Sequence, residues 1–126
     1  MITFKHHTIL LGISGLIGYG AAVAQFTALD PVRVAPHIYE EILDNHQVRV
    51  LKVTERNGET AQLHAHPETL VIHLSPCAWL EINVVDGTER MQSFRLGDAI
   101  WRGPVTHGGQ TSRVVQECSR LEIEIK

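Results

Sequence analysis

The chain has 126 residues, of which 44% are hydrophobic, and its formal net charge is −3. This length and composition suit one domain with a core of its own. It has 11 basic residues but no basic run, and only two Trp, two Tyr and three Phe. Proteins that bind nucleic acids usually carry a clustered positive surface. We therefore expect no nucleic-acid partner.

The first 24 residues predict a secretory signal peptide. A weakly positive start over residues 1–7 precedes an uncharged stretch from Thr8 to Ala24, which ends in Ala-Val-Ala and is followed by Gln25. This is the layout of a cleaved leader. An uncleaved membrane anchor is the alternative, although the stretch is short for a bilayer and its glycines weaken a helix. We expect a periplasmic or secreted protein that contacts a membrane only if the leader is retained.

Export would also bear on the two cysteines, Cys77 and Cys118. In an oxidising compartment a disulfide between them would persist. A pair of small buried side chains is the alternative. The sequence leaves both interpretations open.

From Asp30 onward, hydrophobic residues recur mainly with a period of two, which is typical of strands. One helical turn is predicted over 36–43. Asp86-Gly87 predicts a two-residue hairpin turn and Gly97-Asp98 a further turn. About seven or eight short strands imply an all-β sandwich or barrel. The clearest predicted strands cover 48–53, 69–74, 78–85, 91–96, 99–102 and 120–126.

Two histidines one residue apart raise the question of a metal site. His64 and His66 share one face of a predicted strand, because side chains two apart point the same way. Alone, such a pair is weak evidence, since many are ordinary solvated strand residues. Gly58 precedes the pair in a G-x5-H-x-H frame, and the segment from Gly97 to Gly108 supplies His107.

These two motifs resemble those of the cupin superfamily, G-x5-H-x-H-x3,4-E-x6-G and G-x5-P-x-G-x2-H-x3-N. The resemblance covers residues 30–126 and is greatest to small single-domain, quercetin-dioxygenase-like cupins. It implies a double-stranded β-helix, the cupin jelly-roll barrel, after the signal segment. It also implies that His64, His66 and His107 are ligands of a divalent transition metal, with Fe, Zn, Ni, Cu and Mn as candidates.

The sequence departs from the first cupin motif at its glutamate. Leu70 and Val71 occupy the expected spacing, and an alignment on the strand puts Thr69 there instead. Glu68 is adjacent, but its side chain should point to the opposite face. The second motif has Thr111 where the family has Asn. We therefore expect a site of three histidines without a carboxylate.

His73 stands on the strand face that should look into the barrel. A buried imidazole needs a partner, so one interpretation is a core histidine bonded to the backbone. The other is a catalytic acid–base group or a fourth ligand, since imidazole titrates near neutral pH. His37 and His46 lie outside both motifs and should be surface residues. Trp101 is expected to pack in the core or, alternatively, to wall a small pocket.

Three functions fit these features. The first is a metal-dependent, dioxygenase-like enzyme acting on a small organic substrate. The second is a non-enzymatic module that binds a metal or small ligand. The third is a metal-free isomerase or cyclase in which His73 and His107 transfer protons. If Leu70, Ile72 and Leu74 face outward, their aliphatic row predicts a homodimer.

Overall fold

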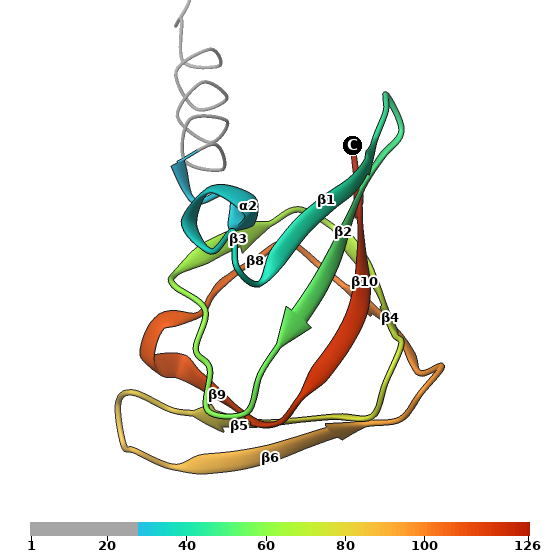
Figure 1. Ribbon diagram of the computed structural model, residues 1–126. Helices are drawn as coiled ribbons and strands as arrows, with labels where there is room; N and C mark the ends of the chain where they lie inside the picture. The colour runs from blue at the N-terminus through green and yellow to red at the C-terminus, as the bar shows by residue number, and fades with distance from the viewer. Residues whose placement is uncertain (1–27) are drawn as a thin grey trace, which may run out of the picture.

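The computed structural model describes residues 28–126, so the predicted signal peptide over residues 1–24 lies outside the described residues. Within this part, no helix is long and apolar enough to cross a membrane. The strands are all antiparallel and form three sheets that curve around one interior (Figure 1). The all-β prediction is therefore confirmed.

The largest sheet has the order β1-β2-β10-β4-β7, a second has the order β6-β5-β9, and β3 pairs with β8. In Figure 1 the β6-β5-β9 sheet lies at the bottom and the β3-β8 pair near the top. The bounds are β1 Tyr39–Asp44, β2 Val48–Glu55, β3 His64–His66, β4 Thr69–His73, β5 Cys77–Ile82, β6 Glu89–Phe94, β7 Ala99–Arg102, β8 Val105–His107, β9 Ser112–Gln116 and β10 Cys118–Ile125, with a 3-10 turn at Gly109–Thr111.

Among the described residues, the short helix α2 covers Pro31–Val34. Its start is fixed by Asp30, whose Oδ1 accepts hydrogen bonds from the backbone N–H groups of Val32 (2.9 Å) and Arg33 (3.3 Å), as expected for an N-cap followed by proline. The helical turn predicted over 36–43 is wrong. Residues 39–44 instead form β1, because pairing with β2 satisfies their backbone groups.

The hairpin predicted at Asp86-Gly87 exists, but its loop is longer than two residues. Strand β5 ends at Ile82 and β6 begins at Glu89. The N–H of Gly87 donates to the carbonyl oxygen of Asn83 at 2.8 Å, and the Asn83 side chain accepts from the Val85 N–H at 2.9 Å. These local bonds compete with the ladder and end the strand early.

Strand β10 reverses the usual rule that apolar side chains face inward. Arg120, Glu122 and Glu124 are buried, at 2%, 0% and 4% exposure, while the alternating Leu121 and Ile123 are only partly buried. The interior beside β10 is therefore charged. Buried ionised groups are costly unless they are paired, so this strand identifies a polar centre inside the barrel.

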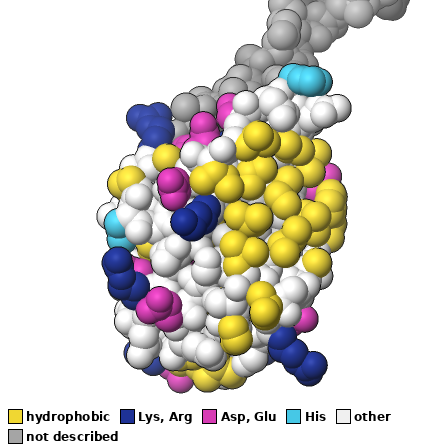
Figure 2. Space-filling view, turned by 45° about the vertical axis from the view of Figure 1, so that its right-hand side comes forward, with side chains coloured by type: hydrophobic (Ala, Val, Ile, Leu, Met, Phe, Trp, Pro, Cys, Tyr) yellow, Lys and Arg dark blue, Asp and Glu magenta, His cyan; other side chains and the backbone are white. Residues whose placement is uncertain are grey.

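The opposite face of the same sheet is apolar, and Figure 2 shows hydrophobic side chains gathered over it. In the register of β10 with β4, Leu121 lies beside Ile72 and Ile123 beside Leu70. Leu74, just past β4, is 44% exposed. The predicted alternation of β4 is confirmed, because its other positions are buried.

An apolar cluster lies beside the polar centre. It is made by α2 and the strands that follow it, and Leu51 and Val53 are fully buried within it. Burial of this kind stabilises a fold by about 25 cal/mol per Å² of apolar surface. The cluster anchors the N-terminal end of the domain over the barrel. Its buried members are Ala35, Ile38, Tyr39, Leu51, Val53 and Ala61.

Candidate metal centre

The three predicted ligand histidines meet at the β3-β8 pair. Antiparallel pairing places His64 directly opposite His107, and the two ring centroids are 4.4 Å apart. The His66 ring lies 4.9 Å from His64 and 5.3 Å from His107. One ligand atom from each can be chosen so that all lie within 4.8 Å of one another. The sequence prediction that these side chains converge is confirmed.

Gly108 allows this close approach. It has φ of 100°, and a Cβ there would lie 2.5 Å from the carbonyl oxygen of Gln62. The next residue, Gly109, donates its N–H to the carbonyl oxygen of Ala61 at 2.7 Å. Only glycine fits a positive φ against backbone without strain. The residue after His107 therefore holds β8 against the segment that leads into His64.

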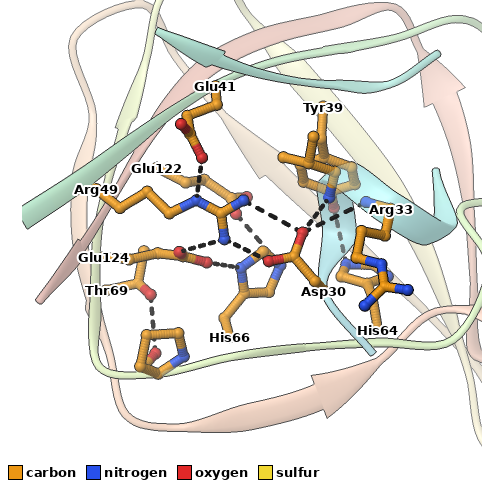
Figure 3. A network of polar contacts seen from close by, with 12 residues as sticks. Asp30, Arg33, Tyr39, Glu41, Arg49, His64, His66, Thr69, Glu122 and Glu124 are labelled. Carbon is orange, nitrogen blue, oxygen red and sulfur yellow. Dashed lines mark hydrogen bonds and ion pairs between the residues drawn. The ribbon is translucent and has the colours of Figure 1, made fainter. Parts of the chain in front are cut away.

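Hydrogen bonds orient two of the imidazoles so that Nε2 carries the lone pair. The His64 Nδ1–H donates to the carbonyl oxygen of Gln62 at 2.6 Å, and its Nε2 accepts from the hydroxyl of Tyr39 at 2.8 Å. The His66 Nδ1–H donates to Glu124 Oε1 at 2.8 Å (Figure 3). We assign the protons to Nδ1 from these acceptors. Such partners commonly fix the tautomer of metal-binding histidines.

Three buried acceptor atoms of the centre have no hydrogen-bond partner within the described residues: His66 Nε2, His107 Nε2 and Glu122 Oε2. Glu122 Oε2 lies 3.4 Å from His66 Nε2. An unsatisfied buried polar group costs about 1–3 kcal/mol. A bound cation would satisfy His66 Nε2 and His107 Nε2 together, because these two rings belong to the same group of converging ligands.

Burial favours the neutral form of two of the ligand histidines, His64 and His107. Burial first, and then the neighbouring His64 and His66, lower the pKa of His107 to about 3. Burial also lowers the pKa of His64, although its bond to Gln62 opposes this. Because a metal binds the deprotonated imidazole, these side chains are in the state that metal binding requires.

Glu122 is held as an anion. Burial would raise its pKa, but the charge of Arg120 outweighs burial and lowers it well below the usual range. Arg120 Nε donates to Glu122 Oε1 at 2.7 Å, and Arg120 also pairs with Glu55. The guanidinium lies 4.9 Å from the Trp79 ring centre. The buried charges are thus paired, as burial demands.

A second ion-pair network supports His66 from the other side. Arg49 Nη1 lies 2.6 Å from Asp30 Oδ2 and 3.4 Å from Glu124 Oε2. Burial raises the pKa of Asp30, but the hydrogen bond and charge of Arg49 outweigh this and lower it. The network joins the helix cap to the strand that orients His66.

A cavity of about 80 Å³ borders the centre. His64, His107 and Trp79 line it, together with Arg102. Within residues 28–126, the side chain of Arg102 forms no hydrogen bond or ion pair. The cavity therefore offers an unpaired cation beside two ligand histidines. The other lining residues are Glu55, Ala61, Glu81, Gly108, Ser112 and Arg120.

His73 lies in a separate buried cluster with the two cysteines. Its Nδ1 is 3.2 Å from Cys77 Sγ, and its ring stacks on Phe94 with centroids 4.6 Å apart. Cys77 and Cys118 form a disulfide, which decides between the two interpretations of the cysteines. The Nε2 atom of His73 has no partner within the described chain.

The remaining predicted positions differ in outcome. His37 and His46 are exposed, as predicted, and so is Glu68. Trp101 is 56% exposed and its indole N–H donates to Glu68 at 2.9 Å, so the predicted core packing is wrong. Trp101 also does not line the cavity beside the histidines. Strand alternation turns it outward, and Trp79 lines the cavity instead.

Sequence reasoning missed three residues that contact the ligand histidines: Tyr39, Glu122 and Glu124. None belongs to either motif. A signal was available in the last strand, where charged residues alternate with Leu and Ile. Read as an inward-facing charged row, that pattern would have placed carboxylates near the histidines.

Comparison with solved structures identifies the fold. The chain is similar to a cupin domain from Bordetella pertussis, with a TM-score of 0.57 and 20% sequence identity over 71% of this chain and 92% of that one. It also matches a cupin superfamily protein from Desulfitobacterium hafniense, with a TM-score of 0.49 and 10% identity over 70% and 75%. No family model and no curated protein matches the chain. The Bordetella likeness shows that the chain has a cupin fold.

Proposed function

We propose that the protein binds one divalent transition-metal ion through His64, His66 and His107 and uses it on a small organic substrate in a dioxygenase-like reaction. The observation that carries the proposal is the convergence of three imidazoles, one ligand atom from each lying within 4.8 Å of the others, with the Nε2 atoms of His66 and His107 buried and without a hydrogen-bond partner among the described residues. Imidazole donors suit Fe, Zn, Ni and Cu, and Mn accepts them together with oxygen ligands. Because the sequence predicts a leader, we propose that the protein acts in the periplasm or outside the cell.

The metal would act as a Lewis acid that binds and polarises oxygen atoms of the reactants. The chain's own residues would supply binding and orientation. Arg102 would attract an anionic oxygen of the substrate, because its side chain lines the cavity and forms no ion pair among the described residues. Trp79 would contact the apolar part of the substrate. A cavity of about 80 Å³ favours a ligand of few atoms.

Two other functions are alternatives to a metal-dependent enzyme. A non-enzymatic metal-binding module is favoured by the small size of the cavity, which leaves little room for two reactants. A metal-free isomerase or cyclase would use His73 and His107 as proton-transfer groups. Burial lowers the pKa of both histidines, so each would act as a neutral base.

Metal analysis of protein purified without a histidine tag tests the proposal. We expect about one equivalent of metal per chain, lost when His64, His66 or His107 is changed to Ala. His37→Ala and His46→Ala are matched controls on the exposed surface and should retain the metal. Metal-free wild-type protein that takes up no divalent ion would refute the proposal and favour the isomerase.

Oxygen uptake separates the two metal-dependent functions. Metal-loaded protein is mixed with small diketones and flavonols, and dissolved oxygen is followed with an electrode. Uptake that requires His64 supports the enzyme. Loaded protein that binds these compounds without consuming oxygen supports the binding module.

A further inference from the structure

The carboxylate that the first motif lacks lies on another strand. Glu122 is fully buried, and β10 places it opposite Val71 of β4 and Leu51 of β2. Val71 is one of the positions at which the first motif would carry its glutamate. The Glu122 side chain therefore enters the same interior from the neighbouring strand.

The contact between Glu122 and His66 is unfavourable as it stands. His66 Nδ1 donates its proton to Glu124, so Nε2 presents a lone pair. That lone pair faces Glu122 Oε2, also without a donor, at 3.4 Å. Two acceptors at this distance repel unless a positive charge lies between them. Either a proton on His66 or a metal ion shared by both atoms would provide it.

The distance favours the shared metal. A metal with bonds of about 2.0–2.1 Å and tetrahedral geometry holds neighbouring ligand atoms about 3.3 Å apart. The observed 3.4 Å agrees with this separation. A charge-assisted N–H···O bond would normally be shorter, at about 2.7–2.9 Å, as the other contact of the same ring is, at 2.8 Å.

The second oxygen of Glu122 is already occupied. Its Oε1 accepts from Arg120 at 2.7 Å, which leaves Oε2 free to face His66 Nε2 at 3.4 Å. Thr69, the other position aligned with the glutamate, donates its hydroxyl to the Pro67 carbonyl at 2.8 Å and is engaged there. We propose that Glu122 Oε2 is a metal ligand beside His64, His66 and His107, an inference that rests on the proposed function.

A carboxylate changes which metal the site prefers. Three imidazoles and one carboxylate reduce a divalent ion's net charge to +1 and add a hard oxygen donor, which suits Fe²⁺, Mn²⁺ or Zn²⁺ better than Cu⁺. The anion also strengthens binding, because the site itself then carries negative charge in a buried environment.

Titration of metal-free protein with Co²⁺ tests the assignment, with visible absorption and calorimetry as readouts. Glu122→Gln should weaken Co²⁺ binding by more than about 100-fold and change the absorption bands, because a ligand is lost. Glu124→Gln is the matched control on the same strand. It should weaken binding by about 10–100-fold, as loss of an outer partner does, and leave the bands unchanged.

A measurement on unsubstituted protein covers the case in which Glu122→Gln does not fold. The infrared difference spectrum between metal-free and Zn²⁺-loaded protein should show a shifted carboxylate stretch, and Glu124→Gln should keep it. Absence of that shift overturns the assignment, as does a folded Glu122→Gln with wild-type affinity and bands. In both cases the proposed function stands if the histidine variants lose metal. If wild type binds neither ion, both ideas fall.

Discussion

Removing the Cys77–Cys118 disulfide should lower the free energy of unfolding by about 4 kcal/mol. The bond joins the first residue of β5 to the first residue of β10, with a sequence separation of 41. For a closed loop of that length, the chain-entropy relation gives about 13 cal/mol/K, or about 4 kcal/mol at 25 °C. Because the two strands belong to different sheets, the bond also limits how far the sheets can separate.

Equilibrium unfolding in urea measures this loss. With a slope of about 2 kcal/mol per molar, the midpoint of the double Cys→Ala variant should fall by about 2 M. Wild-type protein reduced with a thiol is the control and should unfold near the same midpoint as the variant. A loss below about 1 kcal/mol would refute the reasoning, because the unfolded chain would then gain little freedom.

Three further predictions concern the interface, the glycine and the histidines. We expect a homodimer through the outer face of the five-stranded sheet, and Ile123→Glu should give a monomer mass in light scattering. Gly108→Ala should destabilise the fold by about 1–3 kcal/mol and release metal, because its Cβ would lie 2.5 Å from the Gln62 carbonyl oxygen. A wild-type melting temperature and metal content would contradict this. The pKa values of His64, His73 and His107 are lowered, that of His107 to about 3, so in metal-free protein the unfolded chain takes up protons first. The free energy of unfolding should then fall as the pH is lowered from 6.5 toward 3, by up to about 1.4 kcal/mol per pH unit for each histidine. Urea midpoints that do not change between pH 7 and 5 would rule this out.

The histidine cluster could be predicted because its geometry is nearly local. His64 and His66 share a strand face by period alone, and the cupin resemblance supplied His107 as their neighbour. The same period predicted which side of β4 is buried. Where short-range geometry or a known motif determines position, the sequence was sufficient.

Glu122 could not be predicted in this way. Its role depends on β10 lying beside β4, a contact between residues far apart in the chain. Alternating charge and hydrophobicity in β10 would normally place the charges in water, and the ion pairs of Glu122 with Arg120 and of Glu124 with Arg49 make the reverse favourable. The predictions for the turn at 83–88 and for the start of β1 were wrong for a related reason. A side-chain cap at the turn and strand pairing in β1 outweighed the local sequence pattern.

The β3-β8 pair is held by only three residue pairs, which has a consequence for how the molecule would respond to a chelator. An ion bound between His64 and His107 would tie two chain segments that few backbone bonds hold together. Its removal should let the pair open while β2 and β10, joined by eight residue pairs, stay closed. Backbone amides of β3 and β8 would then exchange with heavy water much faster than those of the large sheet. Loss of the ion would therefore open the β3-β8 pair locally and leave the rest of the barrel folded.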